Sequence, residues 1–221
     1  MELHFDQELA QLKERLLLMS SLTEQSVAQA LKALVQRDAA LAKKVDADDD
    51  ALDRLQVEID ERCIRLLALR QPLARDLRLI TMAMKISTDL ERIGDQASGI
   101  ARRASELSAE PELKPLVDIP RMGEICQRMI RDVLDAFVYA KPELARQVIQ
   151  RDEDVDQLNK QLQRELTSFM IEDPGTITRA LLLMRIARNL ERIGDHATNI
   201  AEEVVYLYEA RDIRHQHADR P

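Results

Sequence analysis

The stretch "NLERIGDHATNIA", residues 189–201, repeats the pattern of "DLERIGDQASGIA", residues 89–101. Both copies contain the unbroken string LERIGD, in which a glutamate and an aspartate stand four residues apart. Around the first copy, apolar residues recur every three or four positions, as they do along the buried face of an α-helix. The stretch therefore predicts one helical unit that the chain uses twice.

The composition favours an all-α fold. Hydrophobic residues make up 45% of the 221 residues, but there is no tryptophan and aromatic residues make up only 3%. The core must then consist of aliphatic side chains, methionine and alanine, a composition that favours helices. Five glycines and seven prolines are too few for the many turns of a β-sandwich or barrel.

A proline-containing segment divides the chain. Pro111, Pro115 and Pro120 stand in "SAEPELKPLVDIP", between two long helical patterns. Proline removes a backbone donor and disfavours helix at the residue before it. We predict a first unit over residues 1–107, a linker over 108–119, a second unit over 120–212 and a disordered tail over 213–221.

Each unit is expected to contain three helices. They lie at about 5–36, 39–69 and 72–107 in the first unit, and at about 120–140, 142–170 and 176–210 in the second. Asp53 matches Asp156 at an offset of 103, whereas Glu91 and Glu191 are 100 positions apart. A three-residue deletion near the second interhelical turn reconciles the offsets. This favours two tandem, similar three-helix bundles over one six-helix solenoid, and a duplicated hairpin within one bundle remains open.

Pairs of acidic residues flank the predicted buried faces. Glu91 and Asp95 lie about 40° apart around their helix, and Gly94 between them would let another helix approach closely. Asp49 and Asp53 flank the apolar stripe of the preceding helix. The second unit repeats both pairs, as Glu191 with Asp195 and Asp152 with Asp156.

If these flanks face each other, four carboxylates converge in each bundle. They would raise one another's pKa unless protons, arginine or lysine partners, or bound cations offset the repulsion. Oxygen ligands suit magnesium, manganese, calcium or iron. The alternative is that these acids, among 40 in the chain, line solvated faces or pair with arginines on the same helix.

Longer motifs give the sequence a family resemblance. The segments "LALRQPLARDLRLI", "KISTDLERIGDQASGIA" and "MRIARNLERIGDHATNIAEEVVYL", with "HFDQEL" near the start, resemble the PhoU family of phosphate-signalling regulators. The resemblance covers essentially the whole chain. It implies a cytoplasmic protein that restrains phosphate uptake and the phosphate-starvation response. Its implied partners are the ATP-binding subunit of the phosphate ABC transporter and the associated sensor histidine kinase.

The same resemblance implies a metal site, because some family members hold iron or zinc clusters at E(D)xxxD motifs. Carried over, these motifs point to Glu91, Asp95, Glu191 and Asp195. The geometric argument adds Asp49, Asp53, Asp152 and Asp156 as opposing ligands. We expect iron, zinc, manganese or magnesium as the metal. The copies differ at Gln96 against His196, so the two sites need not be equivalent.

Other functions are less well supported by the residues. Ferritin-like oxidases use Glu-x-x-His pairs, and no such pair accompanies the motif, although an oxidase or a metal store remains an alternative. His196 could accept a phosphoryl group, but Gln96 in the other copy favours a surface or supporting role. A purely structural helical adaptor is the third alternative. No Gly-rich phosphate loop is present, so we expect a non-enzymatic protein that senses phosphate through its partners.

Charge and apolar patterning bound the partners further. The net charge of −8 argues against nucleic acid and against direct attraction to an anionic bilayer. No signal peptide or membrane span is visible, so we expect a cytoplasmic protein, assembled as a homodimer, that reaches the membrane only through its partners. Cys63 and Cys126 lack CxxC spacing and are expected to be buried thiols.

Overall fold

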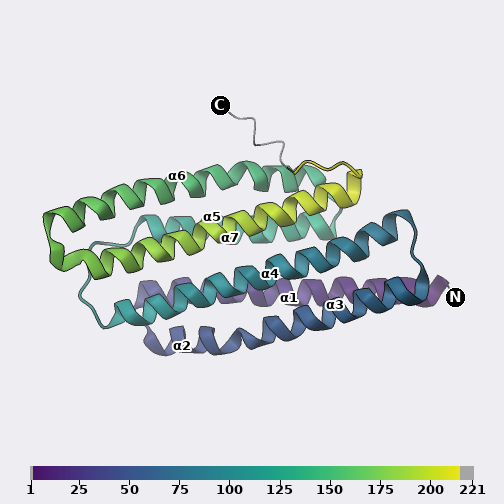
Figure 1. Ribbon diagram of the computed structural model, residues 1–221, viewed down its shortest axis with the longest axis horizontal. Coiled ribbons are helices and arrows are strands. Elements are labelled where there is room, and N and C mark those ends of the chain that lie inside the picture. The colour runs from purple at the N-terminus through teal and green to yellow at the C-terminus, as the bar shows by residue number, and fades with distance from the viewer. Residues whose placement is uncertain (1, 215–221) are drawn as a thin grey trace.

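The computed structural model describes residues 2–214, with side chains from residue 5 onward, and this part of the chain holds helices and no strand. Figure 1 shows long helices running close to the long axis of the molecule. The elements are α1 (Glu2–Gln36), α2 (Ala39–Asp48), α3 (Asp50–Arg70), α4 (Ala74–Ser108), α5 (Asp118–Val138), α6 (Pro142–Glu172), the short 3₁₀ helix η1 (Pro174–Thr176) and α7 (Ile177–Glu209).

The helices form two tandem bundles of similar design, as predicted. In the first bundle, α4 packs against α1, α2 and α3. Helices α2 and α3 together occupy the place of the single helix predicted over residues 39–69. In the second bundle, α5, α6 and α7 pack against one another. The expected all-α fold with an internal repeat is confirmed. The predicted domain limits stay a prediction, and residues 215–221 of the predicted tail lie outside the described residues.

The second predicted helix is interrupted in the first bundle only. Residues 39–69 were expected to form one helix, but α2 ends at Asp48 and α3 begins at Asp50. Asp49 between them keeps helical backbone angles, and its carbonyl accepts from the Leu52 amide at 2.9 Å, which marks a local tightening of the turn. The corresponding helix α6 passes through Asp152 without a break.

Turn chemistry explains where the other helices begin and end. Asp173 accepts a hydrogen bond from the Gly175 amide at 2.9 Å and so caps η1, which begins at Pro174. Helix α4 begins at Ala74 rather than at Pro72, because Gln71 and Ala74 both take positive φ angles at the α3–α4 turn. Helix α5 begins at Asp118, two residues before Pro120.

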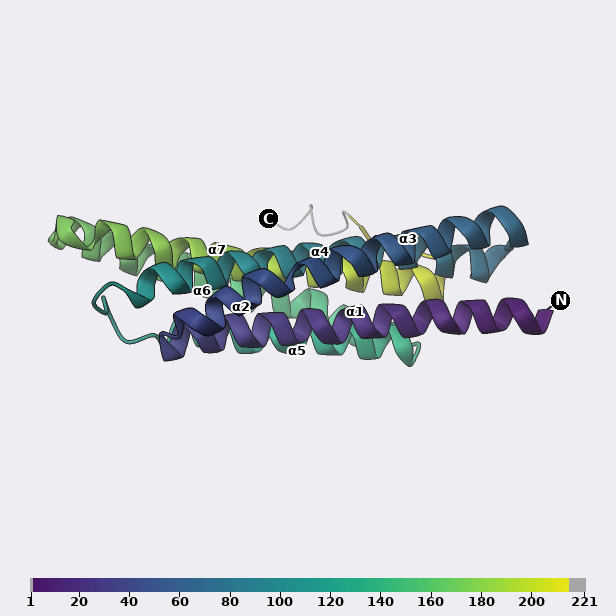
Figure 2. The same ribbon diagram turned by 90° about the horizontal axis from the view of Figure 1, so that it is seen from below.

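The two bundles share one continuous core. Helix α4 packs against α7, which runs in the opposite direction, and α1 packs against α5, as Figures 1 and 2 show. The α3–α4 and α6–α7 turns therefore lie at opposite ends of the molecule (Figure 1). Cys63 and Cys126 are both free and buried, as expected. None of the described helices is long and apolar enough to span a bilayer.

Candidate functional site

The first group of predicted ligands meets where α4 passes the α2–α3 junction. Asp49 stands at the junction, Asp53 follows one turn later, and Glu91 and Asp95 come from α4. Burial raises the pKa of Asp49, and the charges of Asp95 and Asp53 raise it further, against an opposing effect of the nearby Ser98 hydroxyl. The pKa of Glu91 is raised by burial and then by Asp95. The four acids thus share one electrostatic environment.

Glycine permits this close approach, as the sequence predicted. A Cβ atom added to Gly94 would lie 2.3 Å from Cδ1 of Leu52 and 3.2 Å from Oδ1 of Asp49. At the equivalent place in the second bundle, a Cβ on Gly194 would lie 2.6 Å from Oδ1 of Asp152. Each glycine of the LERIGD string therefore leaves room for an acidic side chain of the neighbouring helix.

The second group is more strongly perturbed. Burial raises the pKa of Asp152 to about 7, with further contributions from Asp195, Asp156 and Glu191. Burial also raises the pKa of Asp195, with Asp156 as the next cause. All four predicted ligands of the second bundle act on a common site, in which Asp152 is the group most easily kept protonated.

Neighbouring arginines offset part of this charge. Arg92 places Nη1 3.0 Å from Oδ2 of Asp95 and Nε 3.4 Å from Oε2 of Glu91. In the second bundle, Arg188 contacts Glu191. These pairs lie on one helix, as the non-metal alternative expected.

Asn159 is a buried polar residue that the sequence analysis missed. Its Nδ2 donates to Oε2 of Glu191 at 2.9 Å. It stands three residues after Asp156, and therefore on the same face of α6. That spacing was the available signal.

The residues present suit a metal ion in their chemistry. Oε2 of Glu91 is buried and accepts no hydrogen bond, and the buried Asp152 carries a strongly raised pKa. Carboxylate oxygens are ligands for magnesium, manganese, iron and zinc. Within residues 2–214, however, no three His, Cys, Asp or Glu side chains stand close enough together to hold one ion. The eight-residue ligand assignment therefore stays a prediction.

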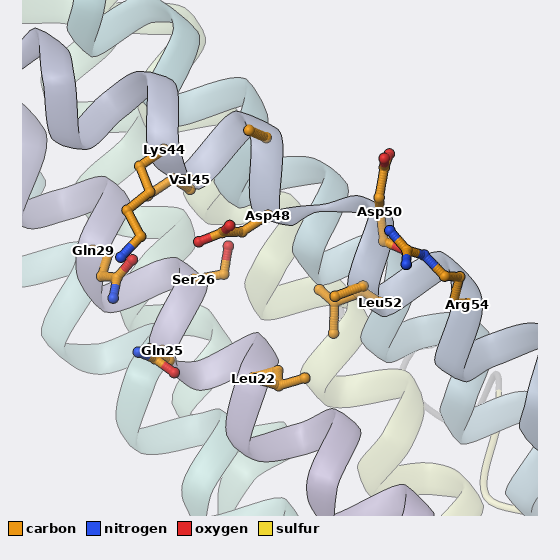
Figure 3. Close-up of a pocket in the computed structure, with 12 residues that line it drawn as sticks. Leu22, Gln25, Ser26, Gln29, Lys44, Val45, Asp48, Asp50, Leu52 and Arg54 are labelled. Atoms are coloured by element: carbon orange, nitrogen blue, oxygen red, sulfur yellow. The ribbon is translucent and has the colours of Figure 1, made fainter.

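A groove opens beside the first carboxylate group. Its cavity of about 260 Å³ lies between α1 and the α2–α3 junction. Figure 3 shows Gln29 from α1 near Lys44, and Ser26 near Asp48. None of the four predicted ligands of the first bundle lines it. The helix break thus creates a polar groove that is separate from the carboxylate group.

His196 belongs to the contact between the bundles. Its Nδ1 lies 2.8 Å from Oδ1 of Asp89 on α4, and Nδ2 of Asn199 donates to the same oxygen at 3.2 Å. The His196 side chain is 22% exposed. These contacts favour a structural role for His196 over the alternative that it accepts a phosphoryl group.

Comparison with known proteins decides the family. The model of the PhoU domain matches the chain twice, at residues 16–104 and 119–204. This chain belongs to the PhoU family. The two matches fall on the two bundles, so the family's repeated unit coincides with the repeat that LERIGD predicted.

Relatives of this PhoU-family chain are similar along nearly its whole length. A phosphate-specific transport system accessory protein PhoU homolog from Pseudomonas aeruginosa is 45% identical over 96% of this chain and 88% of its own. The accessory protein PhoU of Escherichia coli strain K12 is 37% identical over 97% of this chain and 89% of its own.

Solved structures agree with the fold. The crystal structure of PhoU from Pseudomonas aeruginosa superposes with a TM-score of 0.91 at 45% identity, covering 94% of this chain and all of that one. The phosphate transport system regulatory protein PhoU from Streptococcus pneumoniae gives a TM-score of 0.86 at 31% identity, covering 95% and 99%.

Proposed function

We propose that the protein restrains phosphate uptake and the phosphate-starvation response by contact with other proteins, without catalysis of its own. The observation that carries this proposal is the match of both bundles, and of almost the whole chain, to proteins named as accessory or regulatory components of phosphate transport. The sequence has no Gly-rich phosphate-binding loop, which favours action through partner proteins over nucleotide-dependent phosphoryl transfer.

The proposed partners are the ATP-binding subunit of the phosphate ABC transporter and its associated sensor histidine kinase. The two similar bundles pack side by side, and their equivalent α3–α4 and α6–α7 turns lie at opposite ends of an elongated molecule, which would let one chain contact two partners. We place the protein in the cytoplasm, as a homodimer that reaches the membrane through these partners. The acidic net charge supports protein contacts over direct binding to nucleic acid or anionic lipid.

Recovery of partners from cells tests this function. The tagged chain is purified after growth with high and with low phosphate, and the bound proteins are identified by mass spectrometry. We expect components of the phosphate transporter and its kinase, in amounts that differ between the two conditions. Recovery of neither component under either condition would exclude regulation by stable contact.

The carboxylate groups support metal binding as a second property of the same protein. We propose that iron, zinc, manganese or magnesium binds between α4 and the α2–α3 junction, and between α7 and α6. Replacement of Glu91 and Glu191 by Gln, and of Asp95 and Asp195 by Asn, removes the negative charges and should lower the metal content per chain in elemental analysis. Unchanged metal content would remove the assignment, and metal-dependent oxygen consumption would instead indicate an oxidase.

A further inference from the structure

The contact between α4 and α7 has approximate two-fold symmetry that its charges break. An offset of 100 residues relates the two helices, so Lys85 on α4 corresponds to Arg185 on α7, and Arg103 on α4 corresponds to Glu203 on α7. The two helices run in opposite directions (Figure 1). Lys85 therefore faces Glu203, and Arg185 lies near enough to Arg103 to act on its charge. One end of the contact therefore pairs Lys85 with Glu203, and the other pairs Arg185 with Arg103.

At the first end, opposite charges satisfy each other. Nζ of Lys85 lies 2.8 Å from Oε1 of Glu203, whose side chain is only 8% exposed. Arg214 lies 3.8 Å from the same oxygen. The positive charges of these two neighbours offset the cost of burying the Glu203 carboxylate.

At the second end, the corresponding positions bring two cations together. Nδ2 of Asn189 and Nη1 of Arg103 lie 2.2 Å and 3.2 Å from the point that a Cβ on Gly99 would occupy, so Arg103 reaches the surface of α7. Arg185 stands one turn before Asn189 on that helix and is exposed. No carboxylate occupies the position that Glu203 takes at the other end.

The Arg103 guanidinium is poorly satisfied within the described chain. Its Nη1 donates to the Gly99 carbonyl oxygen at 2.6 Å, but its Nε is buried and makes no hydrogen bond. Burial lowers the pKa of Arg103, and the charges of Arg185 and Arg102 lower it further, against a smaller opposing effect of Glu106. An arginine held among other cations, with an unused buried donor, is stabilised by an anion.

We propose that Arg103 and Arg185 bind a multivalent oxyanion, such as phosphate, in the place where the symmetry-related end uses the carboxylate of Glu203. Guanidinium groups present several N–H donors in a plane and bind phosphate oxygens with two parallel hydrogen bonds. Such a site needs no Gly-rich loop. It spans α4 and α7, so the anion would bridge the two bundles.

The test measures the melting temperature of the full chain in phosphate, sulfate, acetate and chloride at equal ionic strength. We expect phosphate and sulfate to raise the melting temperature above its value in chloride, and acetate to have no such effect. Arg103→Gln and Arg185→Gln should each weaken phosphate binding on the order of tenfold in isothermal titration, because each removes a charged donor. Arg185 is exposed, so its variant should fold even if the Arg103 variant does not.

Two controls separate this site from general charge effects. Arg128→Gln removes an exposed arginine of α5, and Glu203→Gln breaks the bridge at the opposite end; both should keep the phosphate effect. A third variant, Arg103→Glu, reproduces the Lys85–Glu203 arrangement, and should be more stable in chloride and lose the response to phosphate. Equal shifts in all four salts, retention of the phosphate effect in Arg185→Gln, or its loss in Arg128→Gln would overturn the proposal.

Discussion

Asp152→Asn should make the metal-free protein more stable at alkaline pH. The carboxyl group lies against Gly194 among Asp195, Asp156 and Glu191, and burial with these charges raises its pKa from 3.8 to about 7. A carboxyl whose pKa is raised in the folded state stabilises the fold fully below pH 3.8. This stabilisation is lost as the pH rises to about 7, because the folded protein must then hold an ionised, buried group.

The magnitude follows from the shift. A shift of about three pKa units corresponds to ~4 kcal/mol as an upper limit. Relaxation and the coupled charges reduce this, so we expect Asp152→Asn to raise the free energy of unfolding by about 2 kcal/mol at pH 8 and to leave it nearly unchanged at about pH 4. Asparagine keeps the size and polarity of the side chain and removes only the charge.

Urea denaturation followed by circular dichroism measures the effect, in EDTA and again with added manganese or zinc. The matched control is Asp154→Asn, which removes an exposed aspartate two residues away on α6. If Asp152 is a metal ligand, the added metal should stabilise the wild type more than the Asp152 variant. A variant that is less stable than the wild type at pH 8 in EDTA, or one that merely matches the control, would refute the electrostatic argument.

Three further predictions concern the rest of the fold. Gly99→Ala should lower the free energy of unfolding by about 1 kcal/mol in urea denaturation, because the added Cβ would lie 2.2 Å from Nδ2 of Asn189, and this clash outweighs alanine's better helix propensity. Asp60→Asn should stabilise the protein more at pH 8 than at pH 4 in urea denaturation, because burial raises the pKa of Asp60 and one of its oxygens is buried without a partner. Equal effects at both pH values would contradict this. Cys63 and Cys126 should react with iodoacetamide only when the protein unfolds, since both are buried and burial raises the pKa of Cys63 to about 12. Mass spectrometry measures the labelling, and rapid labelling of the native protein would contradict the prediction.

The fold could be predicted because the repeat and the apolar periodicity are both local signals. The LERIGD repeat located α4 and α7. The break at Asp49 could not be predicted, because Asp152 at the matching position leaves α6 continuous. The difference depends on packing around the junction rather than on the propensity of the residue itself.

The candidate site could be predicted in part. Helical spacing placed the acidic pairs beside the buried faces, and the structure brings them into one electrostatic environment in each bundle. The arginine and amide partners were less accessible to that argument. Arg188 follows from helical spacing, whereas the bond from Asn159 to Glu191 depends on how α6 and α7 are rotated against each other, which no local pattern specifies.

The contact between the bundles shows how a duplicated sequence can acquire two different ends. Away from the approximate two-fold axis, each residue faces a residue of the other copy that is not its own counterpart. A change in one copy therefore alters one end of the contact and leaves the other intact. Asp89 meets His196 at one place, while Asn189 donates to the Gln96 carbonyl oxygen at the related place.

The charges differ between the two ends in the same way. Lys85 and Glu203 form an ion pair at one end, whereas Arg103 and Arg185 stand near each other at the other end. The offset of 100 residues is visible in the sequence, but its meaning for charge pairing becomes available only once α4 and α7 are known to pack in opposite directions. The unequal ends then allow one symmetric scaffold to hold a closed salt bridge at one end and a site for an anion at the other. Binding at the arginine end would strengthen the contact between the bundles, because the anion contacts both α4 and α7.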